Sequence, residues 1–84
     1  MNELALLKAR YEAACATLDT HHKRWIASSS NPVFTDLAAT KDAVDAAYQV
    51  LMDDYATYEA AKQAAAAAFE RLQNAIDQEA ARWG

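Results

Sequence analysis

Glycine, proline and cysteine are nearly absent from this chain of 84 residues, which contains one of each. Sheets and tight turns depend on glycine, proline and β-branched residues, so the composition argues against a sheet protein. The single cysteine, Cys15, cannot close an internal disulfide, and we expect a reduced, cytoplasmic protein. The glycine-rich loops that hold phosphates are also missing, because neither GxGxxG nor GxxxxGK[ST] occurs.

Long apolar runs and an excess of positive charge are missing as well. No stretch approaches the roughly 18 uncharged apolar residues of a membrane span. The N-terminal residues lack the basic segment and the apolar core of a signal peptide. Twelve acidic residues against eight basic ones give a net charge of −4, which argues against a nucleic-acid partner.

Alanine, the best helix former, fills 22 of the 84 positions. The strongest interruption of this helical pattern is a run of three serines followed by Asn31 and Pro32. Asn31 is a favourable N-cap, and Pro32 fits the first position of a helix, where its missing N–H would be unpaired anyway. Thr35 or Asp36 is the alternative start. The first helix is therefore expected over about residues 3–27.

The second helix is expected over about residues 32–83, so that residues 1–84 form one all-helical domain. In both helices a set of mostly apolar residues recurs every three or four positions, beginning in the first helix with Leu4 and ending with Trp25. This heptad spacing predicts coiled-coil-like packing along a seam. The seam positions of the second helix, with three polar exceptions, are Leu37, Lys41, Val44, Tyr48, Leu51, Tyr55, Tyr58, Lys62, Ala65, Phe69, Leu72, Ile76, Glu79 and Trp83.

The two predicted helices differ in length, at roughly 38 Å and roughly 78 Å. A hairpin would leave the second half of the long helix uncovered, and each large apolar side chain there would gain about 1.5–3 kcal/mol on burial. We therefore expect two hairpins to cover one another in an antiparallel homodimeric bundle. The predicted dimer or partner interface consists of Tyr55, Tyr58, Ala65, Phe69, Leu72, Ile76 and Trp83.

A monomeric three-helix bundle, in which the long helix breaks near residues 53–55, is the alternative fold. No glycine, proline or asparagine marks a turn at that place. The seam also continues from Leu51 to Lys62 without a change of phase. The sequence therefore favours the continuous helix.

The alanine run and the tyrosines each allow two interpretations. The five alanines from Ala64 to Ala68 either favour the helix alone or form a narrow surface on which a second helix packs closely. Tyrosines on a seam are usually core residues whose hydroxyls reach its edge. Alternatively, Tyr55, Tyr58 and Phe69 form the centre of an interface, since aromatic residues dominate binding energy.

An acidic stripe is predicted on the side of the second helix that faces away from the first. It consists of Asp42, Asp45, Gln49 and Asp53. One interpretation is a solvated surface that keeps an alanine-rich protein soluble. The other is a docking surface for a basic protein.

The basic cluster His21–Trp25 has a structural and a functional interpretation too. Cations near the end of a helix favour its dipole, or the cluster binds an anion or a partner with Trp25 as its anchor. The two adjacent histidines match no common zinc spacing, and the serines that follow them lack an arrangement that would activate a nucleophile. We therefore expect no enzyme, with no catalytic, metal-binding or cofactor-binding residue.

The order of a helix, a short Ser/Asn-Pro loop and a longer helix resembles the small helical hairpins of type III secretion, namely needle subunits and their hairpin co-chaperones. The likeness covers the Asn31–Pro32 turn and the spacing of Tyr55 and Tyr58. The first helix lacks the polar N-terminus of a needle subunit. The resemblance implies a structural or chaperone-type subunit of a larger assembly, such as a secretion apparatus.

The function that the sequence favours is a non-catalytic protein–protein interaction module. In size and charge the chain is similar to phage-encoded inhibitors, so a small acidic inhibitor or adaptor that binds a host or cellular protein is expected. The expected partners are a second copy of the chain and another protein, with no membrane partner.

Overall fold

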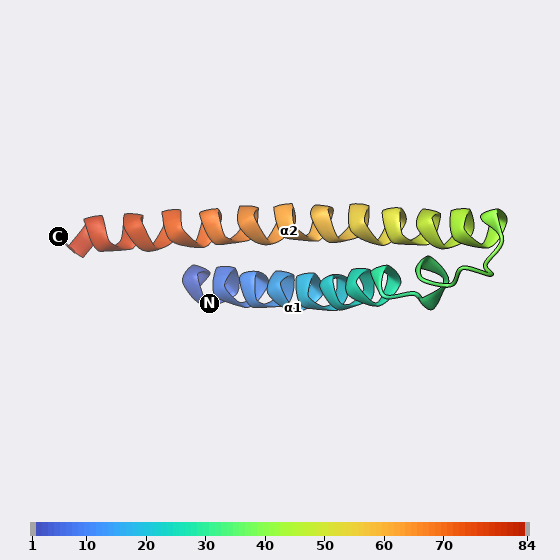
Figure 1. Ribbon diagram of the computed structural model, residues 1–84. Helices are drawn as coiled ribbons and strands as arrows, with labels where there is room; N and C mark the ends of the chain where they lie inside the picture. The colour runs from blue at the N-terminus through green and yellow to red at the C-terminus, as the bar shows by residue number, and fades with distance from the viewer. Residues whose placement is uncertain (1, 84) are drawn as a thin grey trace.

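The computed structural model is a hairpin of two antiparallel α-helices (Figure 1) and describes residues 2–83. Helix α1 comprises Glu3–Ser29, a short 3-10 helix η1 comprises Pro32–Phe34, and helix α2 comprises Lys41–Trp83. No strand occurs in the described range. The predicted all-helical fold and the predicted helical hairpin are confirmed.

Polar side chains fix both ends of α1. The Asn2 side chain accepts a hydrogen bond from the Leu4 N–H at 3.0 Å, which satisfies one of the free donors at the start of the helix. The hydroxyls of Ser29 and Ser30 donate back to the Ile26 carbonyl at 2.8 and 2.9 Å. Because these serines bond within the helix and do not interrupt it, α1 ends two residues later than predicted.

The connection between the helices is longer than the sequence predicts. Asn31 and Pro32 do start a helix, but it is η1, which ends after three residues. The Asn31 side chain accepts a hydrogen bond from the Val33 N–H at 3.0 Å, and the Asp36 side chain accepts one from the Ala38 N–H at 2.9 Å. These short polar side chains bond the backbone locally and so hold turns where a continuous helix was expected.

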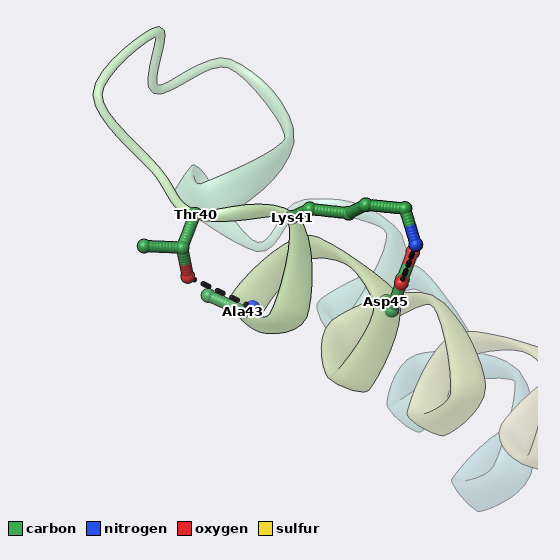
Figure 2. Close-up of polar contacts among 4 residues, drawn as sticks. All are labelled: Thr40, Lys41, Ala43 and Asp45. Carbon is green, nitrogen blue, oxygen red and sulfur yellow. Dashed lines mark hydrogen bonds and ion pairs between the residues drawn. The ribbon is translucent and has the colours of Figure 1, made fainter.

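Helix α2 begins at Lys41, and both predicted starts are therefore wrong. Figure 2 shows the cap, in which the Thr40 hydroxyl accepts a hydrogen bond from the Ala43 N–H at 3.1 Å. The Lys41 ammonium lies 2.8 Å from the Asp45 carboxylate across the first turn. Thr40 is a preferred type of capping residue, and it competes successfully with the earlier caps in the chain.

Helix α2 continues without a break for 43 residues, so the three-helix alternative with a break near residues 53–55 is wrong. Two contacts support the helix at this place. The Thr57 hydroxyl donates to the Asp53 carbonyl at 3.0 Å, and the Ser28 hydroxyl of α1 donates to the Asp54 carboxylate. One of these contacts lies within α2, and the other joins this segment of α2 to α1.

Helix α1 packs against the C-terminal part of α2. The rings of Tyr11 and Phe69 are 5.5 Å apart, and those of Trp25 and Tyr55 are 5.3 Å apart. The expectation that α1 covers the first half of the long helix is therefore wrong, because residues 30–40 carry the connection beyond the end of α1. Figure 1 shows α2 extending past both ends of α1, with η1 beside its first turns.

Small side chains of α2 face α1. In the paired region the less exposed positions of α2 are Leu51, Asp54, Tyr58, Glu59, Ala61, Ala65, Ala68, Leu72, Ala75 and Glu79. Five of these ten lie on the predicted seam, namely Leu51, Tyr58, Ala65, Leu72 and Glu79. In place of Asp54, Ala61, Ala68 and Ala75, the sequence predicts the larger residue that follows each of them. Alanines allow a neighbouring helix to approach closely, and Ala65, 6% exposed, is the one fully buried residue of the described range.

Candidate interaction surfaces

Four aromatic rings meet between α1 and the middle of α2. This aromatic cluster consists of His22, Trp25, Tyr55 and Tyr58. Trp25 stacks on Tyr58 with ring centroids 5.2 Å apart and an interplanar angle of 10°. The His22 ring lies 5.3 Å from that of Tyr58. Since such pairs contribute about 0.5–1.5 kcal/mol each beyond the burial of area, the cluster is a main contact between the helices.

The basic cluster His21–Trp25 lies inside α1 and not at its end. Helix α1 continues to Ser29, and its last turn contains no basic residue. The interpretation of this cluster through the helix dipole is therefore wrong. His22 and Trp25 pack against α2, and Lys23 forms a surface ion pair with Asp19 at 2.9 Å.

An exposed column of large side chains follows one side of α2. We define it as Tyr48, Tyr55, Lys62, Phe69, Ile76 and Trp83, which are spaced seven residues apart and therefore lie almost in line on the helix. The exposed fractions of its apolar members are 55% for Tyr48, 38% for Tyr55, 49% for Phe69, 43% for Ile76 and 81% for Trp83. The column forms an edge of the helix pair that α1 covers only in part, through the contacts of Tyr11 with Phe69 and of Trp25 with Tyr55.

An open apolar groove accompanies the exposed column. Its volume is about 500 Å³, and its lining includes Leu4, Lys8 and Tyr11 of α1 with Leu72 and Ile76 of α2. A second hollow of about 350 Å³, also bordered by Tyr11, continues along Cys15, Leu18, Lys62, Ala65, Ala66 and Phe69. The two hollows thus border the column at Lys62, Phe69 and Ile76, and together they form one face of the hairpin.

The structure divides the predicted interface residues into two groups. Tyr58, Ala65 and Leu72 point toward α1 and are buried or half-buried. The others belong to the exposed column and are Tyr55, Phe69, Ile76 and Trp83. The first group packs within the hairpin. In the second group Tyr55 and Phe69 contact Trp25 and Tyr11 of α1 with one side of their rings and remain partly exposed.

Two tyrosines of this face have altered acidity. Hydrogen bonding with the Cys15 thiol raises the pKa of the Tyr11 phenol above its ordinary value, and desolvation adds to the increase. Hydrogen bonding with Glu59, together with the negative charge of that carboxylate, raises the pKa of Tyr55. Both phenols are therefore neutral at pH 7 and present uncharged edges to the face.

The acidic stripe is exposed along its whole length. Asp42, Asp45 and Gln49 belong to the first turns of α2, beyond the end of α1, and Asp53 follows one turn later. Lys41 pairs with Asp45, and the Gln49 amide donates to the Asp53 carboxylate at 3.0 Å. Pairs of this spacing contribute only about 0.2–0.5 kcal/mol each, so a partner's cations could replace them at small cost.

Sequence reasoning missed the apolar surface at the loop end of the hairpin. Leu37 was expected on the helical seam, but it lies in the connection and is fully exposed. Val33 and Val50 border a hollow of about 330 Å³ between the connection and α2. The sequence shows that these residues are apolar. Their positions, however, depend on a turn at Asp36, which periodicity alone does not reveal.

Two kinds of feature are absent from residues 2–83. No group of three or more histidine, cysteine, aspartate or glutamate side chains is placed so that it could hold a metal ion. Within the same range no helix combines the length and the apolar character that crossing a membrane requires.

Comparison of the chain with protein-family models, with curated proteins and with solved structures found no match in any of the three. The surfaces described above are therefore the basis for a functional proposal.

Proposed function

We propose that this chain is a non-catalytic protein–protein interaction module, a small acidic inhibitor or adaptor that works as a homodimer. The amount of apolar surface that the hairpin leaves exposed supports this proposal. Among the described residues only Ala65 is fully buried, whereas large apolar side chains from Leu6 to Trp83 are exposed. Contiguous apolar patches of this kind usually mark an interaction site.

The elongated shape of the hairpin also leaves a large total surface, polar and apolar together, in contact with solvent. The chain has a mass of 9.2 kDa and exposes 6320 Å², whereas a compact monomer of this mass exposes about 4,900 Å². Its radius of gyration is 19.2 Å, against about 12 Å for a compact domain of this length. The excess of about 1,400 Å² is larger than the roughly 800 Å² that each partner buries in a standard interface.

The two surfaces differ in the partner that they suit. The exposed column is apolar and regularly spaced, which favours coiled-coil-like packing against another helix. The acidic stripe is charged and lies on the first turns of α2, away from α1. Charge contributes mainly to specificity and to the rate of association, so this stripe suits a partner with a basic surface.

The acidic stripe is tested by binding to an immobilised peptide rich in lysine and arginine. We expect the variant Asp42→Asn, Asp45→Asn, Asp53→Asn to bind at least about tenfold more weakly than the unaltered chain. The matched control removes three other exposed charges through Glu12→Gln, Glu70→Gln and Asp77→Asn.

The control separates a defined docking surface from simple attraction by net charge, because both variants lose the same charge. A clearly smaller loss in the control variant supports the stripe. An equal loss in both variants contradicts the stripe as a specific site. Circular dichroism should show the same helix content in all three proteins.

A further inference from the structure

A run of small residues lies beside the centre of the exposed column, between Lys62 and Phe69. The alanine run Ala64–Ala68 lies midway between Tyr48 and Trp83 along α2. Ala66 is exposed and borders the hollow between α1 and α2. Two copies of α2 could therefore approach most closely at this point, with the large side chains packing on either side of it.

The two halves of α2 differ in charge. Residues 41–61 contain five acidic residues and one basic residue, whereas residues 62–83 contain three of each, with Arg82 paired to Glu79. A parallel pair of α2 helices would place the acidic turns of both copies together, which is unfavourable. An antiparallel pair places the acidic first half of each helix beside the charge-balanced second half of the other and opposes the two helix dipoles.

The ends of α2 are also the parts that α1 leaves uncovered (Figure 1). Tyr48 and Trp83, the outermost members of the column, are the most exposed of its apolar residues. They are equally distant along the chain from the midpoint between Ala65 and Ala66. An antiparallel pair centred on that midpoint therefore covers each of them with the other.

We infer that the occupant of the exposed column is a second copy of this chain, packed antiparallel about the Ala65–Ala66 midpoint. Tyr48 then contacts the partner's Trp83, Tyr55 the partner's Ile76, and Lys62 the partner's Phe69. The inference rests on the proposed homodimer and adds its face, its direction and its register. The excess surface of about 1,400 Å² per chain is enough for a stable dimer of this kind.

Cysteine crosslinking tests direction and register without removing any member of the column. Met52→Cys, Ala66→Cys and Ala80→Cys are introduced one at a time into a Cys15→Ala background, and a short bismaleimide is added. All three positions are exposed, and each lies one turn after a member of the column. In the antiparallel pair two copies of position 52 are about 40 Å apart, which is beyond the reach of the reagent.

We expect Ala66→Cys alone to crosslink, and the 52 and 80 variants to crosslink only when mixed in denaturant and refolded together. Crosslinking of Met52→Cys with itself would overturn the antiparallel direction. Failure of the mixture while Ala66→Cys reacts would overturn the register. Light scattering separates these results from failure of the homodimer, since a mass of 9.2 kDa at all concentrations would overturn both proposals.

A charge placed on the column tests the face itself. Tyr48→Glu should weaken self-association at least about tenfold, as measured by sedimentation over a dilution series. Val50→Glu is the control, because Val50 is 54% exposed, close to the 55% of Tyr48, and lies off the column. Equal weakening by both substitutions would overturn the assignment of this face.

Discussion

Replacing Ala65 by leucine tests whether α1 and α2 approach most closely at this position. Ala65 is 6% exposed, and it borders the hollow shared with Tyr11 and Leu18 of α1. Leucine adds three carbon atoms at a position that α1 covers directly. The variant must therefore push α1 away or force neighbouring side chains out of their preferred rotamers.

The expected loss of stability follows from this packing. Inserting extra carbon atoms into a packed contact costs about 1–3 kcal/mol. For a domain of this size each kcal/mol lowers the Tm by about 4–8 °C, so a cost of about 2 kcal/mol corresponds to about 8–16 °C. The difference in helix propensity between alanine and leucine is only a few tenths of a kcal/mol and does not account for such a change.

Ala67→Leu provides the matched control, because Ala67 belongs to the same alanine run and is exposed. Thermal unfolding is followed by far-ultraviolet circular dichroism at equal protein concentrations, since self-association also raises the Tm. We expect Ala65→Leu to melt well below the unaltered chain and Ala67→Leu close to it. Equal melting temperatures for the two variants would refute the packing of α1 on the alanines of α2.

Two further predictions concern the start of α2 and the tyrosines. Thr40→Ala removes the cap of α2 and should lower the Tm by about 4–8 °C, the equivalent of about 1 kcal/mol. Thr35→Ala should change the Tm little, and an equal loss would argue against Thr40 as the cap. The pKa values of Tyr11 and Tyr55 are raised in the folded state, so both phenols contribute to stability while they are protonated. This contribution is complete below the pKa of the unfolded phenol and decreases as the pH rises through the folded pKa. Urea unfolding at alkaline pH should show a smaller decline for the Tyr11→Phe, Tyr55→Phe variant, and an unchanged decline would contradict the assignment.

The presence of two helices could be predicted from the sequence, but the residue at which the second helix begins could not. Alanine content and the lack of glycine predict helix almost everywhere. Asn31 and Thr40 are both competent caps, however, and local pattern does not decide which of them begins the long helix. That choice depends on how η1 packs beside the first turns of α2, which is a tertiary contact.

The same limit applies to the side of α2 that faces α1. Phe69 and its neighbour Ala68 both fit a spacing of three and four, and sequence reasoning favours the larger residue for a buried position. In the structure Ala68 faces α1 and Phe69 is exposed, because small side chains allow the two helices to come close. Periodicity identifies the apolar half of the helix but not the column within it that stays exposed.

The candidate surfaces were predictable to different degrees. The exposure of the acidic stripe follows from helix geometry alone, as does its separation from α1. The aromatic cluster was not predicted, because pairing Trp25 with Tyr55 requires the length of the connection. The length of the connection also sets how α1 and α2 are aligned, and this alignment decides which predicted interface residues face α1 and which are exposed. Sequence analysis could therefore name these residues without assigning their contacts.

Helix α2 also gives the molecule a fixed length. Its 43 residues form a straight rod of about 64 Å, which accounts for the 66 Å long axis of the chain. A protein that touches both ends of α2 must bridge that distance. Inserting seven residues would lengthen the rod by about 10.5 Å while nearly preserving the direction of every side chain, whereas inserting five would turn one end away from the other.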